Sequence, residues 1–81
     1  MKIKCLVFGK YAEAIGTETA ELELGEGADV GSALEKLRET VPNGELIPRS
    51  TMVAINQSHA LADQILEEGD EMAILPPLAG G

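Results

Sequence analysis

The residues with the clearest chemical potential stand at the C-terminus, where the chain ends in PPLAGG, residues 76–81. Gly80 and Gly81 have no Cβ, so they can enter a channel that excludes every other residue. Pro76 and Pro77 favour extended polyproline geometry, and six such residues at about 3.1 Å each could reach roughly 20 Å. A stiff base with a slim tip suits delivery of the Gly81 carboxyl group into another protein's active site. The alternative is a frayed end without function.

Other residue types that could do chemistry give weaker signals. Cys5 lies within a strand-like pattern, where a small buried thiol is expected, so we interpret it as a core residue. His59 has no cysteine or carboxylate at ligand spacing, and no metal site is predicted. The chain lacks a glycine-rich phosphate motif, so this chain alone is expected to bind no cofactor. The acidic residues between 63 and 71 are interpreted as a solvated surface rather than a cation site.

Length and composition limit the possible functions. A chain of 81 residues forms one small domain with a thin core, which leaves little room for an active-site cleft. The net charge of −8 argues against a nucleic-acid partner, because phosphates would repel this surface. One cysteine excludes an internal disulfide and fits a reducing cytoplasm. No apolar run approaches the ~20 residues that span a bilayer, and no membrane partner is expected.

Hydrophobic periodicity predicts the secondary structure. Alternating patterns indicate strands at 2–8, 19–24, 51–56 and 71–75, with a further short strand near 59–61. Asp29 is a suitable N-cap for a helix whose apolar stripe consists of Val30, Leu34, Leu37 and Val41. Residues 10–16 could form one helical turn closed by Gly16, and residues 45–50 are predicted as a loop.

This order of elements suggests an α+β fold of the β-grasp type, with a mixed sheet of four to five strands and one main helix across one face. In that fold the first and last strands lie side by side and parallel in the sheet centre. The diproline cannot donate ladder hydrogen bonds, so the sheet must stop at Leu75. We therefore divide the chain into a domain at 1–75 and an extended tail at 76–81.

The strand patterns also predict which face of the sheet the helix covers. The covered face carries Ile3, Cys5, Val7, Val53, Ile55, Met72 and Ile74. The opposite face should be wet, yet it carries Leu6, Phe8, Met52, Ala54, Ala73 and Leu75. If the first and last strands run parallel, Phe8 and Leu75 lie at the same end of the sheet, and an antiparallel third strand would bring Met52 there too. Such an exposed apolar patch suggests a partner interface, unless a loop covers it.

Three stretches make the sequence similar to the ubiquitin-like sulfur carriers, and most of all to the small subunits of molybdopterin synthase. These stretches are IKCLVFGKYAEAIG near the start, VAINQ in the middle and EEGDEMAILPPLAGG at the end. The ending PPLAGG after GDEMAIL is the most specific of them, whereas the middle from Gly25 to Ser50 is generic.

The resemblance implies a carrier rather than an enzyme acting alone. A ubiquitin-activating-like adenylyltransferase would use ATP to adenylate Gly81, and a persulfide would convert the adenylate to a thiocarboxylate. The large synthase subunit would then receive the sulfur for a cyclic pyranopterin, in an assembly of two carriers on a dimer of large subunits. In the family, residues at the positions of Phe8 and Leu75 dock on that subunit. Met52, Pro76, Pro77 and Leu78 are expected to join this contact, whereas a family contact near His59 is in doubt.

Three other functions stay open. The chain could carry sulfur for thiazole synthesis, tRNA thiolation or cysteine synthesis. It could be a ubiquitin-like modifier that forms isopeptides with lysines, or a plain interaction module with an idle tail. The identity of the co-purifying partner, covalent conjugates in lysate, and the effect of deleting Gly80 and Gly81 would separate these alternatives.

Overall fold

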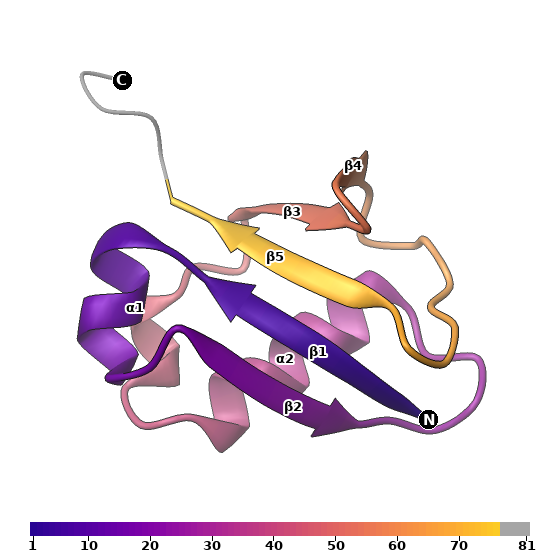
Figure 1. Ribbon diagram of the computed structural model, residues 1–81, viewed down its shortest axis with the longest axis horizontal. Helices are drawn as coiled ribbons and strands as arrows, with labels where there is room; N and C mark the ends of the chain where they lie inside the picture. The colour runs from indigo at the N-terminus through magenta and orange to yellow at the C-terminus, as the bar shows by residue number, and fades with distance from the viewer. Residues whose placement is uncertain (77–81) are drawn as a thin grey trace.

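A computed structural model describes residues 1–76 of the chain (Figure 1). The elements run β1 (Lys2–Val7), α1 (Gly9–Ile15), β2 (Thr19–Glu23), α2 (Val30–Thr40), the 3₁₀ turn η1 (Gly44–Leu46), β3 (Met52–Ile55), β4 (Ser58–Ala60) and β5 (Glu71–Leu75). The predicted strands and main helix are therefore confirmed, with small shifts at their ends. The turn η1 replaces part of the predicted loop, because a three-residue turn has no periodicity that a sequence could display.

The strands form one mixed sheet in the order β2-β1-β5-β3-β4. β1 pairs parallel with β5, and its other neighbour β2 is antiparallel. β3 pairs antiparallel with both β5 and β4. The first and last strands thus lie side by side within the sheet, as the β-grasp fold requires, and that prediction is confirmed.

Local signals explain where the helices begin and end. Asp29 Oδ1 accepts a hydrogen bond of 2.9 Å from the backbone N–H of Ser32, so Asp29 is the N-cap of α2. This bond favours the ionised carboxylate and lowers the pKa of Asp29. Gly16 ends α1 in the left-handed conformation, with φ of 82°, as expected for a helix C-cap.

The core lies between α2 and one face of the sheet (Figure 1). Every residue predicted for the covered face is buried, and α2 contributes Val30, Ala33, Leu34 and Leu37. Tyr11 and Ile15 of α1 extend this core at one end of the sheet. Ile47 and Leu66 are also buried, although both lie in segments that the sequence indicates only as connections.

Candidate functional site

The point where the chain leaves the sheet is the structural start of the candidate site. β5 ends at Leu75, and Pro76 follows as the last described residue. The predicted tail residues Pro77, Leu78, Gly80 and Gly81 lie outside the described residues. The structure therefore bears on the surface that surrounds the root of the tail, and the role of the tail stays a prediction.

Apolar side chains gather on the uncovered face of the sheet beside this root. The register pairs Leu6 with Ala73 in β5, so Phe8 follows β1 toward the level of Leu75. Met52 of β3 is the direct partner of Leu75. We call this set the exit patch; it consists of Leu6, Phe8, Met52, Ala73 and Leu75. The predicted convergence of three strands at one end of the sheet is confirmed.

Two members of the exit patch are the most exposed. Phe8 is 44% accessible and Met52 is 48% accessible, whereas Leu6, Ala73 and Leu75 are half-buried. Phe8 and Met52 lie on either side of Leu75, and their exposed phenyl ring and thioether leave apolar area in water, which a docking partner would remove. Phe8 and Met52 are therefore the natural anchor residues of this surface.

Ala54 departs from the expected wet face. Its side chain is on the same face as the exit patch, yet only 9% of the residue is accessible. Ala73 and His59 are its partners on the two neighbouring strands, and they flank its small methyl group. Ala54 therefore contributes little contact area to a partner, although it was expected to be exposed there.

The far end of the same face is charged instead of apolar. Lys2 lies opposite Glu23, and Lys4 lies between Glu21 on β2 and Glu71 on β5. Cross-strand pairs of opposite charge are compatible with an exposed sheet surface. The uncovered face thus has an apolar half beside the tail root and a charged half at the N-terminal end of β1.

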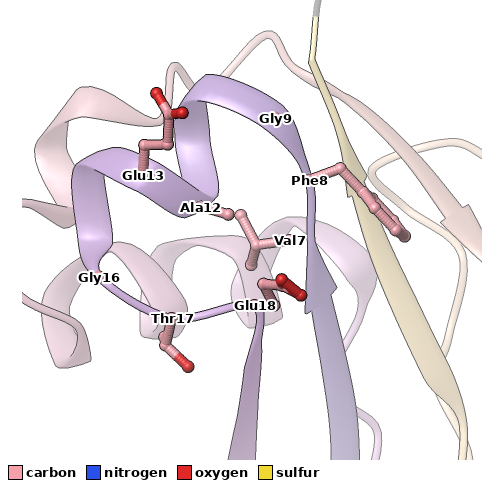
Figure 2. Close-up of a pocket in the computed structure, with 8 residues that line it drawn as sticks. All are labelled: Val7, Phe8, Gly9, Ala12, Glu13, Gly16, Thr17 and Glu18. Carbon is pink, nitrogen blue, oxygen red and sulfur yellow. The ribbon is translucent and has the colours of Figure 1, made fainter.

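A hollow of about 540 Å³ adjoins the exit patch where β1 passes into α1 (Figure 2). Figure 2 shows the ring of Phe8 pointing away from this hollow, on the side of β5. The hollow is lined by Val7, Phe8, Gly9, Ala12, Glu13, Gly16, Thr17 and Glu18. Its polar side chains are two carboxylates and one hydroxyl, with no imidazole, thiol or amine beside them. The Thr17 hydroxyl donates a hydrogen bond of 2.9 Å to the backbone carbonyl of Thr19 and not to either carboxylate, so it is not activated as a nucleophile.

Cys5 is buried against the core, with none of its surface accessible. Burial disfavours the thiolate and raises the pKa of Cys5 to about 12. A reactive cysteine needs a lowered pKa and access to solvent, so the geometry supports the interpretation of Cys5 as a core residue.

His59 lies on β4 opposite Ala54 and is exposed. Over residues 1–76, no group of three or more histidine, cysteine, aspartate or glutamate residues is arranged to hold a metal ion. None of the helices in this part of the chain has the length and apolar character needed to cross a membrane.

Sequence reasoning missed two residues that contact the tail root. Thr51 Oγ1 donates a hydrogen bond of 2.8 Å to the carbonyl oxygen of Leu75. Gly9 lies against the ring of Pro76, where an added Cβ would come within 3.4 Å of the proline Cγ. No local sequence signal could reveal these contacts, because each joins segments that only the folded sheet brings together.

Comparisons with known proteins agree with this fold. The ThiS family model matches residues 5–81. A molybdopterin synthase sulfur carrier subunit from Chlamydomonas reinhardtii is 35% identical over 83 residues, with 100% of both chains covered. The small archaeal modifier protein 1 of Haloferax volcanii is 30% identical over 84 residues, covering 93% of this chain and 95% of its own. The crystal structure of SAMP1 from Haloferax volcanii matches with a TM-score of 0.87 at 26% identity, covering 100% of both chains.

Proposed function

Because the chain belongs to the ThiS family, we propose that it is the sulfur-carrier subunit of a molybdopterin synthase and that the Gly81 carboxyl group carries the sulfur. Relatives with this name match over the full length of the chain. The observation that carries the proposal is the exit patch, an apolar surface placed directly beside the root of a Gly-Gly tail. A carrier needs such a surface for docking next to the group that it delivers.

The proposed loading chemistry begins at the terminal carboxylate. An oxygen of Gly81 attacks the α-phosphate of ATP, forming an acyl-adenylate and releasing pyrophosphate. The terminal sulfur of a donor persulfide attacks the acyl carbon, and AMP leaves. A second thiol then attacks the resulting acyl disulfide, so that the thiocarboxylate departs and the thiol and the donor share a new disulfide. ATP and the persulfide belong to the activating system, and this chain supplies the carboxyl group.

Delivery is the second proposed stage. The large synthase subunit binds the exit patch, and the tail places the thiocarboxylate beside a cyclic pyranopterin. The thiocarboxylate sulfur attacks an electrophilic carbon of the pterin precursor and displaces an oxygen leaving group, which forms a thioester. Water then attacks the thioester carbonyl and the acyl C–S bond breaks, so the sulfur stays on the pterin and Gly81 leaves as a carboxylate. Phe8, Met52 and Leu75 form the docking surface in this proposal, and Pro76, Pro77 and Leu78 continue it along the tail. The full assembly is proposed as a heterotetramer of two carriers and two large subunits.

The division of labour follows from what the chain offers. We assign catalysis to the partners, because the hollow beside the exit patch has no activated nucleophile and Cys5 is held as a buried thiol. A cytoplasmic site of action is part of the proposal, since an unpaired cysteine suits a reducing compartment.

The test uses intact-mass spectrometry after incubation with an ATP-dependent activating enzyme from the same organism, ATP and inorganic sulfide. Wild-type protein should gain the mass difference of one sulfur replacing one oxygen, located on the C-terminal peptide. Deletion of Gly81, Gly80→Val, or one residue appended after Gly81 should each abolish the gain. The shortened chain should keep its stability within ~0.5 kcal/mol, because a terminal glycine has no side chain to bury.

Cys5→Ala is the matched control and should load like the wild type. Sulfur found on Cys5, or a normal gain of mass by the shortened chain, would show that Gly81 is not the carrier residue. Because the other sulfur-carrier pathways would pass this test as well, purification of the loaded carrier's large partner is needed to identify the pathway.

A protein-modifier role is the second candidate, and the likeness to small archaeal modifier protein 1 favours it. In that role, a lysine amine would attack the activated Gly81 carbonyl and displace the leaving group, forming an isopeptide. Covalent conjugates that disappear when Gly81 is deleted would support it. Free carrier and thiocarboxylate without conjugates would support the synthase role alone.

A further inference from the structure

The root of the tail is held from both sides by groups outside β5. On the β3 side, Thr51 Oγ1 donates its hydrogen bond to the carbonyl oxygen of Leu75, with the two residues 24 positions apart. On the β1 side, Gly9 at the start of α1 lies beside the Pro76 ring. Figure 1 shows the end of β5 lying between the start of α1 and the start of β3. We call Thr51 and Gly9 the exit clamp.

Each half of the exit clamp depends on a particular residue type. Gly9 has a φ of 59°, a conformation that side-chain-bearing residues rarely adopt. An added Cβ at Gly9 would lie 3.4 and 3.7 Å from the Cγ and Cβ of Pro76, in ordinary van der Waals contact, so the backbone conformation rather than lack of space favours glycine here. Pro76 cannot donate a ladder hydrogen bond, so the sheet itself does not hold the chain past Leu75.

The hydrogen bond from Thr51 can fix the chain at the point where the ladder hydrogen bonds of the sheet end. The carbonyl of Leu75 is the last one before the proline ring, so its orientation fixes the direction in which the chain departs. A hollow lies beside the root, lined by Tyr11, Pro48, Ser50, Thr51, Met52, Leu75 and Pro76. Side chains therefore do not fill the space around the root on this side, and the hydrogen bond from the Thr51 hydroxyl is the directional contact there.

We propose that Thr51 and Gly9 are positioning residues that aim the tail, while the exit patch provides affinity for the partner. This inference rests on the proposed function, because aim matters only if Gly81 is delivered to an active site. Five residues at about 3.1 Å each would span about 15 Å in a fully extended chain, and over such a span a rotation of roughly 20° at the root would move the tip by about 5 Å. A misplacement of that size lowers the fraction of docked carriers whose carboxyl group is aligned for reaction.

The experiment separates binding from delivery with steady-state kinetics of sulfur transfer from the thiocarboxylated carrier to the cyclic pyranopterin on the purified large synthase subunit, with the carrier concentration varied. Thr51→Val keeps the β-branched shape and removes the hydroxyl; it should lower kcat about 5-fold, the factor carried by one ordinary hydrogen bond, with KM unchanged. Thr51→Ser should restore kcat, because serine can donate the same bond. Phe8→Ala should show the reverse pattern, a raised KM with kcat retained.

Thr40→Val is the matched control for the same substitution elsewhere. Thr40 Oγ1 also donates to a backbone carbonyl, that of Lys36 at 2.6 Å, but on α2 and away from the tail. It should leave both kcat and KM at the wild-type values. In the Thr51→Val protein, the ¹³C resonance of the Leu75 carbonyl should shift, while resonances of the core stay in place.

Each outcome bears on the exit clamp. A lowered kcat with normal KM, rescued by serine, supports it. A wild-type kcat in Thr51→Val overturns the clamp while the carrier function stands. A lowered kcat together with a raised KM and shifted NMR resonances throughout the core does the same, because it indicates a disturbed fold. Failure of the wild-type protein to gain sulfur removes the proposed function, and the clamp with it.

Discussion

The two faces of the sheet use neighbouring residues for different purposes. On the covered face, Ile74 and Val53 are buried against the helix, whereas Leu75 and Met52, one position away on the same strands, belong to the exit patch. Strand alternation alone separates the two sets. The comparison teaches that stability and partner binding are encoded in the same short segments and can be changed independently. Three predictions test this separation, beginning with the largest expected effect.

The thiol of Cys5 should react very slowly in the folded protein, because it lies on the covered face of the sheet. With a pKa of about 12 against 9.0 for an ordinary thiol, its thiolate fraction at pH 8 falls about 10³-fold, and burial also blocks access. A disulfide reagent at pH 8 should label the native protein slowly and the protein in guanidinium chloride rapidly. The same shift lowers stability above pH 9, because there the unfolded chain ionises Cys5 while the folded chain does not.

Met52→Cys in a Cys5→Ala background is the matched probe of the open face. Position 52 is exposed, so this thiol should react at nearly the rate of the unfolded chain. Rapid labelling of native Cys5 would contradict the assignment of its side chain to the core.

Ile74→Ala should change stability and leave the docking surface in place. Ile74 has no accessible surface, and its truncation to alanine removes buried methyl groups and opens a cavity, at about 3 kcal/mol. Urea unfolding followed by circular dichroism measures the loss, and Ile74→Val should lose only about 1 kcal/mol. Leu75→Ala, one residue along, should cost clearly less stability than Ile74→Ala. Equal costs at the two positions would show that the two faces are not energetically distinct.

Phe8→Ala should produce the opposite result, with binding weakened and the fold retained. As an exposed anchor of the exit patch, Phe8 should contribute about 2 kcal/mol to binding of the large synthase subunit, a loss of about 30-fold in affinity. Titration calorimetry with the purified large subunit measures this change. Lys4→Ala, at the charged end of the same face, is the control and should change affinity by less than ~0.5 kcal/mol. Unchanged affinity in Phe8→Ala would exclude the exit patch as the docking surface.

Local patterns in the sequence determined the elements of this protein and the face on which each residue lies. Alternation placed Ile3, Cys5 and Val7 in the core, and the Asp29 cap fixed the start of α2. The resemblance in the terminal GDEMAILPPLAGG indicated the family before the fold was known. These signals are readable because they depend on neighbours in the chain, whose spacing follows the period of a strand or a helix.

Only the tertiary structure decided which of these residues meet. The parallel pairing of β1 and β5, which the fold type predicted, brings Phe8 to the level of Leu75, but nothing in the sequence indicated which residues surround the root of the tail. The same pairing sets Gly9 against Pro76, and the β3–β5 register leaves Thr51 to bond the Leu75 carbonyl. Burial of Ala54, Ile47 and Leu66 likewise depends on segments packed from elsewhere. Such contacts form only after distant segments pair, so the periodicity within a single segment cannot predict them.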